Sequence, residues 1–383
     1  MKRILLLTLV SVLTLSALAQ KFVGGDISML KEFIDKGAVY KDKDGNIVEP
    51  ITFFKQQGWN AMRIRLFVDP AKATEKEKRE GVIQDLAYVK ALGKSIKDAG
   101  LNFMLDFHYS DTWTHPGQHA TPNAWSNMTI AEKTAQIALY TKECLEELKA
   151  TGATPDIIQT GNEISDGMLY PSGRVSVGGS TSTGGASWAN FAGYLASAIK
   201  ACKEVCPNAK IAIHTELHAP NNVPKFYNIL AQYPDVKFDI IGLSYYPDYH
   251  GELSVLDNVL TTLEYQHPDR NIMIVETGYG FKWQISGATK NLTGTYPTTE
   301  EGQKKFTIDL IKLLNQHQNV NGLYWWYPEY TLNNIVFING NENWNKNFTN
   351  GYWNGALFQY NTGKALPALY ELTTFLNGEA SIH

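Results

Sequence analysis

Two glutamates in the sequence each come at the end of a short apolar run. Glu163 ends the segment DIIQTGNE (156–163), and Glu276 lies in NIMIVET (271–277). If both runs are β-strands, both carboxylates lie where a buried strand meets solvent. A facing pair of carboxylates can cleave a glycosidic bond, because one donates a proton to the leaving oxygen while the other attacks the anomeric carbon. A carboxyl separation of about 5–5.5 Å favours retention of anomeric configuration, and about 6.5–9.5 Å favours inversion.

Neighbouring polar residues indicate which glutamate is the acid/base and which is the nucleophile. Asn162 directly precedes Glu163, and an amide at this position can bond a sugar 2-hydroxyl, which favours Glu163 as the acid/base. Arg63 and Arg65 lie in another apolar run, and a nearby guanidinium keeps a carboxylate ionised by lowering its pKa. Either arginine would make Glu276 the nucleophile, and the sequence leaves open which of the two contacts it.

Polar residues also gather at the carboxyl ends of the other apolar runs. These ends carry Arg63, Arg65, Asp106, His108, Asn162, Glu163, His214, Tyr245, Glu276 and Trp326. A lone histidine in such a place is more often a satisfied buried polar group than a catalyst. Polar residues at the ends of so many runs are harder to explain by packing, and they predict a functional site. In that site we expect Tyr245 to hydrogen-bond Glu276.

The apolar runs alternate with longer helical patterns along the chain. The runs are 22–28, 60–67, 101–109, 156–163, 209–215, 238–246, 271–277 and 321–327, and the helical patterns are 80–98, 129–150, 187–205, 252–265, 299–317 and 364–376. Because parallel strands need crossover connections, this alternation predicts the α/β class and a (β/α)8 TIM barrel, a single domain with enlarged βα loops. A doubly wound open sheet is the alternative, but no G-x-G-x-x-G follows the first run.

Composition and charge narrow the class of protein. Of the 383 residues, 44% are hydrophobic and 19% charged, which allows a sizeable core and excludes a disordered chain. The net charge of −4 gives no indication of a nucleic-acid partner. The 9 Trp and 20 Tyr residues suit ligands with flat apolar faces, such as sugars. Nothing in the sequence asks for more than a monomer.

The N-terminal residues have the pattern of a secretory signal. Lys2 and Arg3 precede an apolar stretch that ends at the A-x-A site of Ala17–Ala19. We therefore expect residues 1–19 to be a signal peptide, residues 20–383 to be the catalytic barrel, and the protein to be secreted with no membrane span. The stretch is too short for a confident membrane anchor.

The three cysteines do not form a disulfide framework. Cys202 and Cys206 are four residues apart and could form one local bridge, but buried or reduced thiols are favoured, as for Cys144. No CxxC pair with nearby histidines suggests zinc.

Several stretches, taken together, resemble one known family. They are GGDIS (24–28), NAMRIRLF (60–67), LDFHYSDTWTHPGQ (105–118), QTGNEISDGMLYPSG (159–173), IGLSYYPDYHGEL (241–253) and IVETGY (274–279). They resemble the endo-β-1,4-galactanases of glycoside hydrolase family 53, which belong to a larger clan of retaining (β/α)8 glycosidases. The stretches run in order across almost the whole chain after the leader, and the third and fourth are long enough to be specific.

This resemblance implies an enzyme, its substrate and its site. It implies endo-hydrolysis of β-1,4-linked galactan, the side chain of type I arabinogalactan and pectin, with Glu163 as acid/base and Glu276 as nucleophile. The preference between long galactan and short galacto-oligosaccharides stays open. By the same matching, the residues that line the cleft would be His108, Asp111, Trp113, Asn162, His214, Tyr245 and Trp326.

The chain departs from the family pattern at two cleft positions. Where the family tends to have Trp-Glu-Pro after the eighth strand, this chain has Trp326-Tyr327-Pro328, with Glu329 displaced. Tyr249 stands where a tryptophan is usual. Both departures put details of the sugar contacts in doubt and leave the chemistry in place.

No metal or cofactor is expected to take part. Bacterial relatives often carry a structural calcium in the loop after the seventh strand, but that loop here, 278–297, contains no Asp or Glu. Calcium favours several oxygen ligands including carboxylates, so a structural calcium is not supported.

Three other functions compete with this interpretation. One is a retaining β-glycanase of the same clan that acts on mannan, xylan or cellulose. Another is a catalytically silent carbohydrate-binding protein, against which the intact glutamate pair argues. The third, a metal-dependent hydrolase, lacks an HExxH motif or a carboxylate cluster.

Overall fold

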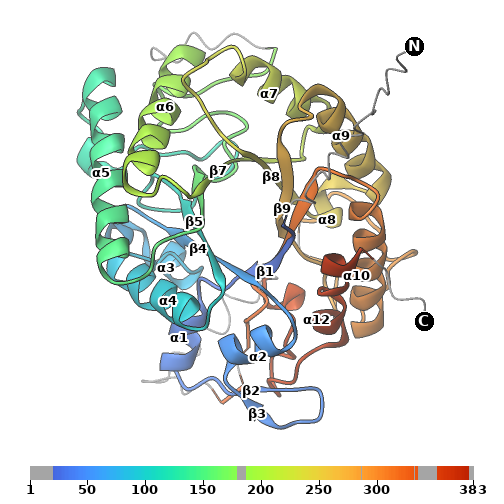
Figure 1. The fold of residues 1–383 in the computed structure, drawn as a ribbon. Coiled ribbons are helices and arrows are strands. Elements are labelled where there is room, and N and C mark those ends of the chain that lie inside the picture. The colour runs from blue at the N-terminus through green and yellow to red at the C-terminus, as the bar shows by residue number, and fades with distance from the viewer. Residues whose placement is uncertain (1–19, 179–186, 286, 332, 335–351, 379–383) are drawn as a thin grey trace, which may run out of the picture.

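The computed structural model describes residues 20–178, 187–285, 287–331, 333–334 and 352–378. Eight parallel strands close into a barrel in the order β1-β10-β9-β8-β7-β6-β5-β4, and helices surround it (Figure 1). The barrel strands are β1 (Phe22–Asp26), β4 (Ala61–Leu66), β5 (Asn102–Phe107), β6 (Ile157–Thr160), β7 (Lys210–Glu216), β8 (Ile240–Tyr245), β9 (Asn271–Thr277) and β10 (Val320–Trp326). The predicted (β/α)8 barrel is confirmed, and each of the eight predicted runs overlaps one barrel strand, although β7 ends one residue after its run and β10 begins one residue before its run.

The helices cover the outside of the barrel and its loops. They are α1 (Leu30–Asp35), α2 (Pro50–Gln56), α3 (Glu75–Arg79), α4 (Leu86–Asp98), α5 (Ile130–Ala150), α6 (Trp188–Val205), α7 (Val223–Leu230), α8 (Pro247–His250), α9 (Leu253–Gln266), α10 (Glu300–Leu314), α12 (Pro367–Glu371) and α13 (Thr374–Asn377). All six predicted helical patterns contain helices, although the last holds two short ones. The sequence patterns did not predict α7, which follows β7.

Local sequence explains where the clearest helix begins. In α5 the Thr129 side chain accepts from the Glu132 backbone N–H, and the Glu132 side chain accepts from the Thr129 backbone N–H. This capping box satisfies donors that the first helical turn leaves unpaired. A separate hairpin, β2 (Tyr40–Lys41) with β3 (Ile47–Val48), lies beside α2 at the lower edge of Figure 1.

The barrel has an apolar interior and an apolar outer layer. The side chains that form the inner cluster are Ala61, Met104, Ile157, Ala212, Ile240, Met273, Val275 and Tyr324. A larger cluster fills the space between the strands and the helices. The first and last strands meet in parallel, with Asp26 opposite Trp326. Gly24 is required in β1 because a Cβ there would lie 1.8 Å from the Ala61 carbonyl oxygen.

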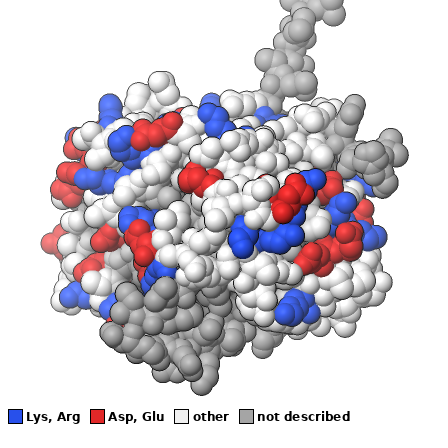
Figure 2. All heavy atoms as spheres, turned by 90° about the horizontal axis from the view of Figure 1, so that it is seen from below, with Lys and Arg blue, Asp and Glu red and all other residues white. Residues whose placement is uncertain are grey.

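Cysteines, membrane helices and surface charge give three further results. Cys144, Cys202 and Cys206 are buried and unpaired. Within the described ranges, every helix is too short or too polar to cross a membrane. The face seen in Figure 2 carries lysines and arginines side by side with acidic residues. The predicted leader, residues 1–19, lies outside the described residues and stays a prediction.

Candidate active site

A cleft of about 850 Å³ opens at the carboxyl ends of the barrel strands. Both Glu163 and Glu276 line it. Glu276 lies in β9, and Glu163 follows β6 by three residues. Active sites of TIM barrels form at this end because the βα loops converge there. The structure therefore brings the two predicted glutamates into one cavity.

Arg63 is the charged centre below this cleft. Its Nη1 lies 2.8 Å from Asp26 Oδ2, and its Nη2 lies 2.8 Å from Asp106 Oδ2 and 2.9 Å from Glu276 Oε1. Nη2 also donates to Asn162 Oδ1 over 3.0 Å. Since Arg63 is only 1% exposed, these acceptors replace the water that its charge would otherwise need.

Glu276 accepts two charge-stabilising contacts. Arg63 contacts Oε1, and the Tyr246 hydroxyl donates to Oε2 over 2.9 Å. Burial raises the pKa of Glu276, and the negative charges of Asp26 and Asp106 add to this, whereas Arg63 and Tyr246 oppose it. The two contacts favour the ionised carboxylate, which is the form that a nucleophile needs.

Glu163 has the opposite electrostatic surroundings. Burial raises its pKa well above the ordinary range, and the charges of Glu276 and then Glu216 raise it further, while Ser244 and Arg63 oppose the shift. Because no arginine pairs with it among the described residues, Glu163 retains a proton at a pH where Glu276 has lost its own.

The backbone of Glu163 is held in an uncommon conformation. Its φ is 47°, in the left-handed region that non-glycine residues seldom adopt. Its N–H donates to His214 Nδ1 over 3.2 Å, and its carbonyl accepts from His119 Nε2 over 3.2 Å. These bonds turn the chain after β6 so that the Glu163 side chain enters the cleft.

The prediction that Tyr245 hydrogen-bonds Glu276 is wrong. Tyr245 ends β8 and is buried, and its hydroxyl donates to the Gly251 carbonyl 2.7 Å away. The next residue, Tyr246, lines the cleft and makes the bond to Glu276. Successive side chains of a strand point to opposite faces, so an error of one residue selects the wrong face.

Most of the other predicted site residues line the same cleft. They are Arg63, Arg65, His108, Trp113, Asn162 and Trp326. Arg65 does not pair with Glu276. Its Nη1 contacts Asp26 Oδ1 at 3.0 Å, its Nη2 donates to Tyr327, and its guanidinium lies 4.7 Å from the centre of the Trp113 ring. Of the two arginines, it is therefore Arg63 that contacts Glu276.

Two predicted cleft residues lie behind its wall instead. His214 is fully buried, and its Nδ1 accepts from Glu163 N–H while its Nε2 donates to Ser244 Oγ over 2.8 Å. Burial and the Arg63 charge lower its pKa well below the ordinary value, so it is neutral. Asp111 accepts from the Asn123 backbone N–H over 2.8 Å, at the start of a 3-10 helix over Asn123–Trp125. Both residues position loops, and neither lines the cleft.

The comparison with known proteins now decides the family. The model described as "Glycosyl hydrolase family 53" matches residues 22–372. The chain belongs to glycosyl hydrolase family 53. It is therefore a glycoside hydrolase, in agreement with the prediction from its motifs.

Three relatives of this glycoside hydrolase illustrate the match. The "Probable arabinogalactan endo-beta-1,4-galactanase A" of Neosartorya fischeri is 30% identical over 84% of this chain and 87% of its own. The solved "Ignisphaera aggregans GH53 catalytic domain" is 28% identical, with a TM-score of 0.78 over 93% of this chain and 96% of that chain. A structure from a study of two fungal beta-1,4-galactanases is 26% identical, with a TM-score of 0.76 over 93% and 99%.

The two departures from the family 53 pattern have different outcomes. Glu329 does not line the cleft: it is fully buried, and its Oε1 accepts from the Met29 backbone N–H over 2.9 Å. Burial, with the nearby Asp26 charge, raises the pKa of Glu329 to about 8. Tyr249, in contrast, lines the cleft where the family usually has tryptophan.

Sequence reasoning missed three residues on one side of the cleft. Glu216, His218 and His250 line it together with Tyr246. The predicted apolar run that corresponds to β7 stops at Thr215. The next letters, ELH, continue the polar pattern that marks the other strand ends. Reading the run one residue further would have found Glu216.

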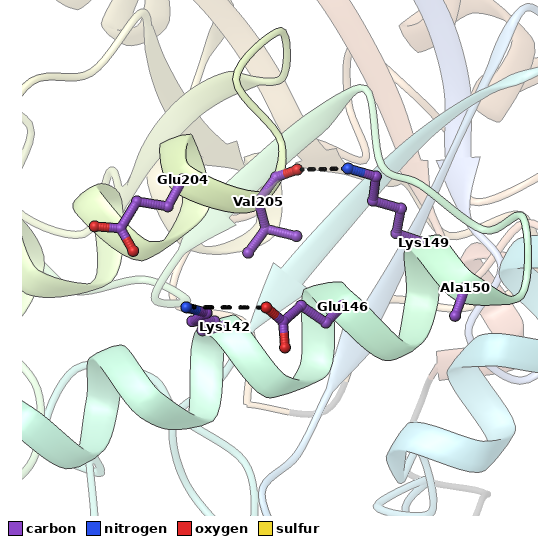
Figure 3. A pocket seen from close by; sticks show the side chains of 6 residues that line it. All are labelled: Lys142, Glu146, Lys149, Ala150, Glu204 and Val205. Atoms are coloured by element: carbon purple, nitrogen blue, oxygen red, sulfur yellow. Dashed lines mark hydrogen bonds and ion pairs between the residues drawn. The ribbon is translucent and has the colours of Figure 1, made fainter.

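The described residues outside the cleft include a further hollow with charged side chains but no cluster of metal ligands. Across the described ranges, no group of three or more His, Cys, Asp or Glu side chains could hold a metal ion. A shallower hollow lies between α5 and α6, where Lys142 pairs with Glu146 and Lys149 donates to the Val205 carbonyl (Figure 3). The ion pair lies within α5, and the contact to α6 is made with a backbone carbonyl, so this hollow shows no cluster of side chains that indicates chemistry.

Proposed function

We propose that this protein is a retaining endo-β-1,4-galactanase in which Glu163 is the acid/base and Glu276 the nucleophile. The observation that carries the proposal is the contrast between the two carboxylates. Glu276 is held by Arg63 and Tyr246, while the pKa of Glu163 is raised by burial and by two nearby negative charges. This division gives one proton donor and one anion, as a double displacement requires.

In the first step, Glu276 attacks the anomeric carbon while Glu163 donates its proton to the departing glycosidic oxygen. The bond to the leaving sugar breaks, and a covalent glycosyl-enzyme forms on a Glu276 oxygen. In the second step, Glu163, now ionised, takes a proton from water as the water attacks the same carbon and Glu276 departs. Two inversions leave the product with the starting anomeric configuration.

Other cleft residues have roles that fit this scheme. Asn162 donates to the Thr114 carbonyl over 2.8 Å, and an amide nitrogen carries a second hydrogen that can reach a sugar 2-hydroxyl. Trp326 and Trp113 offer aromatic faces for galactose rings. The names of the relatives support β-1,4-galactan as the substrate. We also propose that the enzyme is exported and monomeric, on the strength of its leader-like residues 1–19 and its self-contained barrel.

The test is hydrolysis of galactan by the wild type, Glu163→Ala and Glu276→Ala, with product anomers followed by proton NMR. We expect β-anomers to appear first and both variants to lose at least about a thousandfold in kcat. Initial α-anomers would overturn the retaining mechanism. Cleavage of mannan, xylan or cellulose in place of galactan would overturn the substrate and leave the roles of the glutamates intact.

A further inference from the structure

The proposed mechanism leaves one carboxylate of the cleft unused. Glu216 ends β7, the neighbour of β6, and it lines the cleft on the side of Glu163, since its N–H donates over 3.3 Å to Ser165 Oγ, two residues after Glu163. Its Oε2 accepts from the His218 backbone N–H. Among the described residues, no lysine or arginine pairs with Glu216, and the one ion-pair contact within 4.0 Å is His250. A carboxylate in a cleft without a cationic partner is available to a ligand.

His250 completes this side of the cleft with a defined tautomer. Its Nδ1 accepts from the Tyr246 backbone N–H over 3.0 Å, so this nitrogen carries no hydrogen. Burial lowers the pKa of His250 to about 4, and the neutral ring therefore has its hydrogen on Nε2. That Nε2 lies 3.9 Å from Glu216 Oε2. The donor and the acceptor are too far apart to bond each other directly.

This gap has the geometry of a site for one hydroxyl group. A hydroxyl between the two atoms can donate to Glu216 and accept from His250 Nε2 at the same time. Sugars present such hydroxyls, and carboxylates bind them with charge-assisted hydrogen bonds. His218 is exposed and lines the cleft next to Glu216, where its ring can pack against the same sugar.

We propose that Glu216, His218 and His250 form the subsite for the first sugar on the leaving-group side of the scissile bond. The side follows from Glu163: an acid/base lies next to the leaving oxygen, and Glu216 ends the strand beside β6 with its N–H bonded to Ser165, two residues after Glu163. This subsite rests on the proposed function. In the first step Glu216 binds the leaving-group sugar. In the second step it binds the sugar acceptor that competes with water for the glycosyl-enzyme.

The experiment measures how the glycosyl-enzyme partitions between a sugar acceptor and water. A 4-nitrophenyl β-1,4-galactobioside donor forms the glycosyl-enzyme, and added β-1,4-galactobiose then competes with water for it. The ratio of galactotetraose formed to galactobioside hydrolysed reports acceptor binding. Because Glu163 acts as the base toward both acceptors, a change in its pKa cancels from this ratio.

We expect Glu216→Gln to lower the ratio about tenfold, because the charge-assisted bond to the acceptor is lost. The matched control is Glu252→Gln, an exposed carboxylate just after α8 that does not line the cleft, and it should keep the wild-type ratio. If Glu216→Gln fails to fold, His218→Ala replaces it, since that side chain is exposed. We expect a decrease of about threefold from this variant.

The outcomes separate the two proposals. A folded Glu216→Gln, or His218→Ala in its place, with a wild-type ratio would overturn the subsite, even if its pH profile moved. A wild type that hydrolyses neither this donor nor galactan would overturn the proposed substrate, and the subsite with it. A selective decrease in the Glu216 and His218 variants supports the subsite.

Discussion

The Tyr246 hydroxyl donates to Glu276 Oε2 over 2.9 Å, on the carboxylate whose other oxygen contacts Arg63. The hydroxyl and the guanidinium thus bind separate oxygens of the proposed nucleophile. An anion that accepts two such bonds is fixed in orientation as well as in charge. In the proposed mechanism, one of these contacts weakens when Glu276 forms its bond to sugar and is restored when that bond breaks.

Tyr246→Phe should lower kcat by roughly ten- to a hundredfold and move the acidic limb of the pH profile upward, because loss of the hydroxyl donor raises the pKa of Glu276. The measurement is kcat/KM on galactan as a function of pH. Tyr245→Phe is the matched control, since its hydroxyl donates to the Gly251 carbonyl and should affect stability only. An acidic limb in Tyr246→Phe that matches the wild type would contradict the assignment.

The pH profile of the wild type should be bell-shaped. Activity falls at low pH as Glu276 takes up a proton and at high pH as Glu163 loses one. Because burial and the charges of Glu276 and Glu216 raise the pKa of Glu163, the basic limb should lie well above the ordinary value for glutamate, which is about 4.3. Initial rates measured from about pH 4 to about pH 9 check this, because that range covers both limbs of the profile. A basic limb at the ordinary carboxyl pKa would exclude Glu163 as the acid.

Arg63→Lys should remove activity and destabilise the fold by roughly 3–5 kcal/mol, because an ammonium cannot replace a planar guanidinium that serves three carboxylates. Denaturant unfolding and kcat measure the two effects. Arg65→Lys is the comparison, since Arg65 contacts Asp26 but neither glutamate of the pair. Equal losses of kcat in both variants would show that Arg63 has no special role at the nucleophile.

Glu329→Gln should stabilise the protein near neutral pH. The pKa of Glu329 is about 8 in the folded protein and lower in the unfolded chain, where the side chain is exposed. Between these two values the carboxyl is ionised mainly when the chain is unfolded. The contribution of Glu329 to the free energy of unfolding is then fully present below about pH 4 and declines until about pH 8. At pH 7 the loss is roughly 3 kcal/mol. The amide mimics the protonated acid and should remove this decline. Melting temperatures at pH 5 and pH 8 test it, and a variant that is less stable than the wild type at pH 8 would contradict it.

Removal of divalent metals should leave the enzyme unchanged. The charge partner of Glu276 is Arg63, and the loop over 278–297 contains no acidic side chain. After dialysis against EDTA, we expect kcat within about twofold of its starting value and an unchanged melting temperature, since no step needs a metal. A fall in melting temperature that calcium restores would instead indicate a calcium site outside these residues.

Much of this architecture was predictable because buried strands leave a strong sequence signal. Eight apolar runs predicted eight barrel strands, and their polar ends predicted both glutamates and several of the residues around them, whereas most of the cleft wall comes from loops. Long parallel strands are buried on both faces, so they show as nearly continuous apolar runs. The same property hides which face a residue occupies, because the alternation between faces disappears. That is why Tyr245 was chosen in place of Tyr246.

The remaining errors have a similar physical origin. His214 and Asp111 have residue types that suit sugar binding, and only the folded backbone shows that they bond to loops instead. Glu329 looked like a displaced cleft residue, but the turn at Tyr327, with φ of 55°, directs it into the interior. Hydrogen bonds between distant segments decide these positions, and a linear pattern does not record them.

The Arg63 contacts also tie catalysis to assembly. Arg63 lies on β4, and its carboxylate partners come from the first strand of the barrel, from β5 and from β9. Asp26 reaches its place only when β1 inserts between β4 and β10 and closes the ring. The ionic environment of the nucleophile is therefore completed by the same event that joins the two ends of the sheet. During refolding, enzymatic activity should return with ring closure and not with the earlier recovery of helical signal, so turnover serves as an internal reporter of a finished barrel.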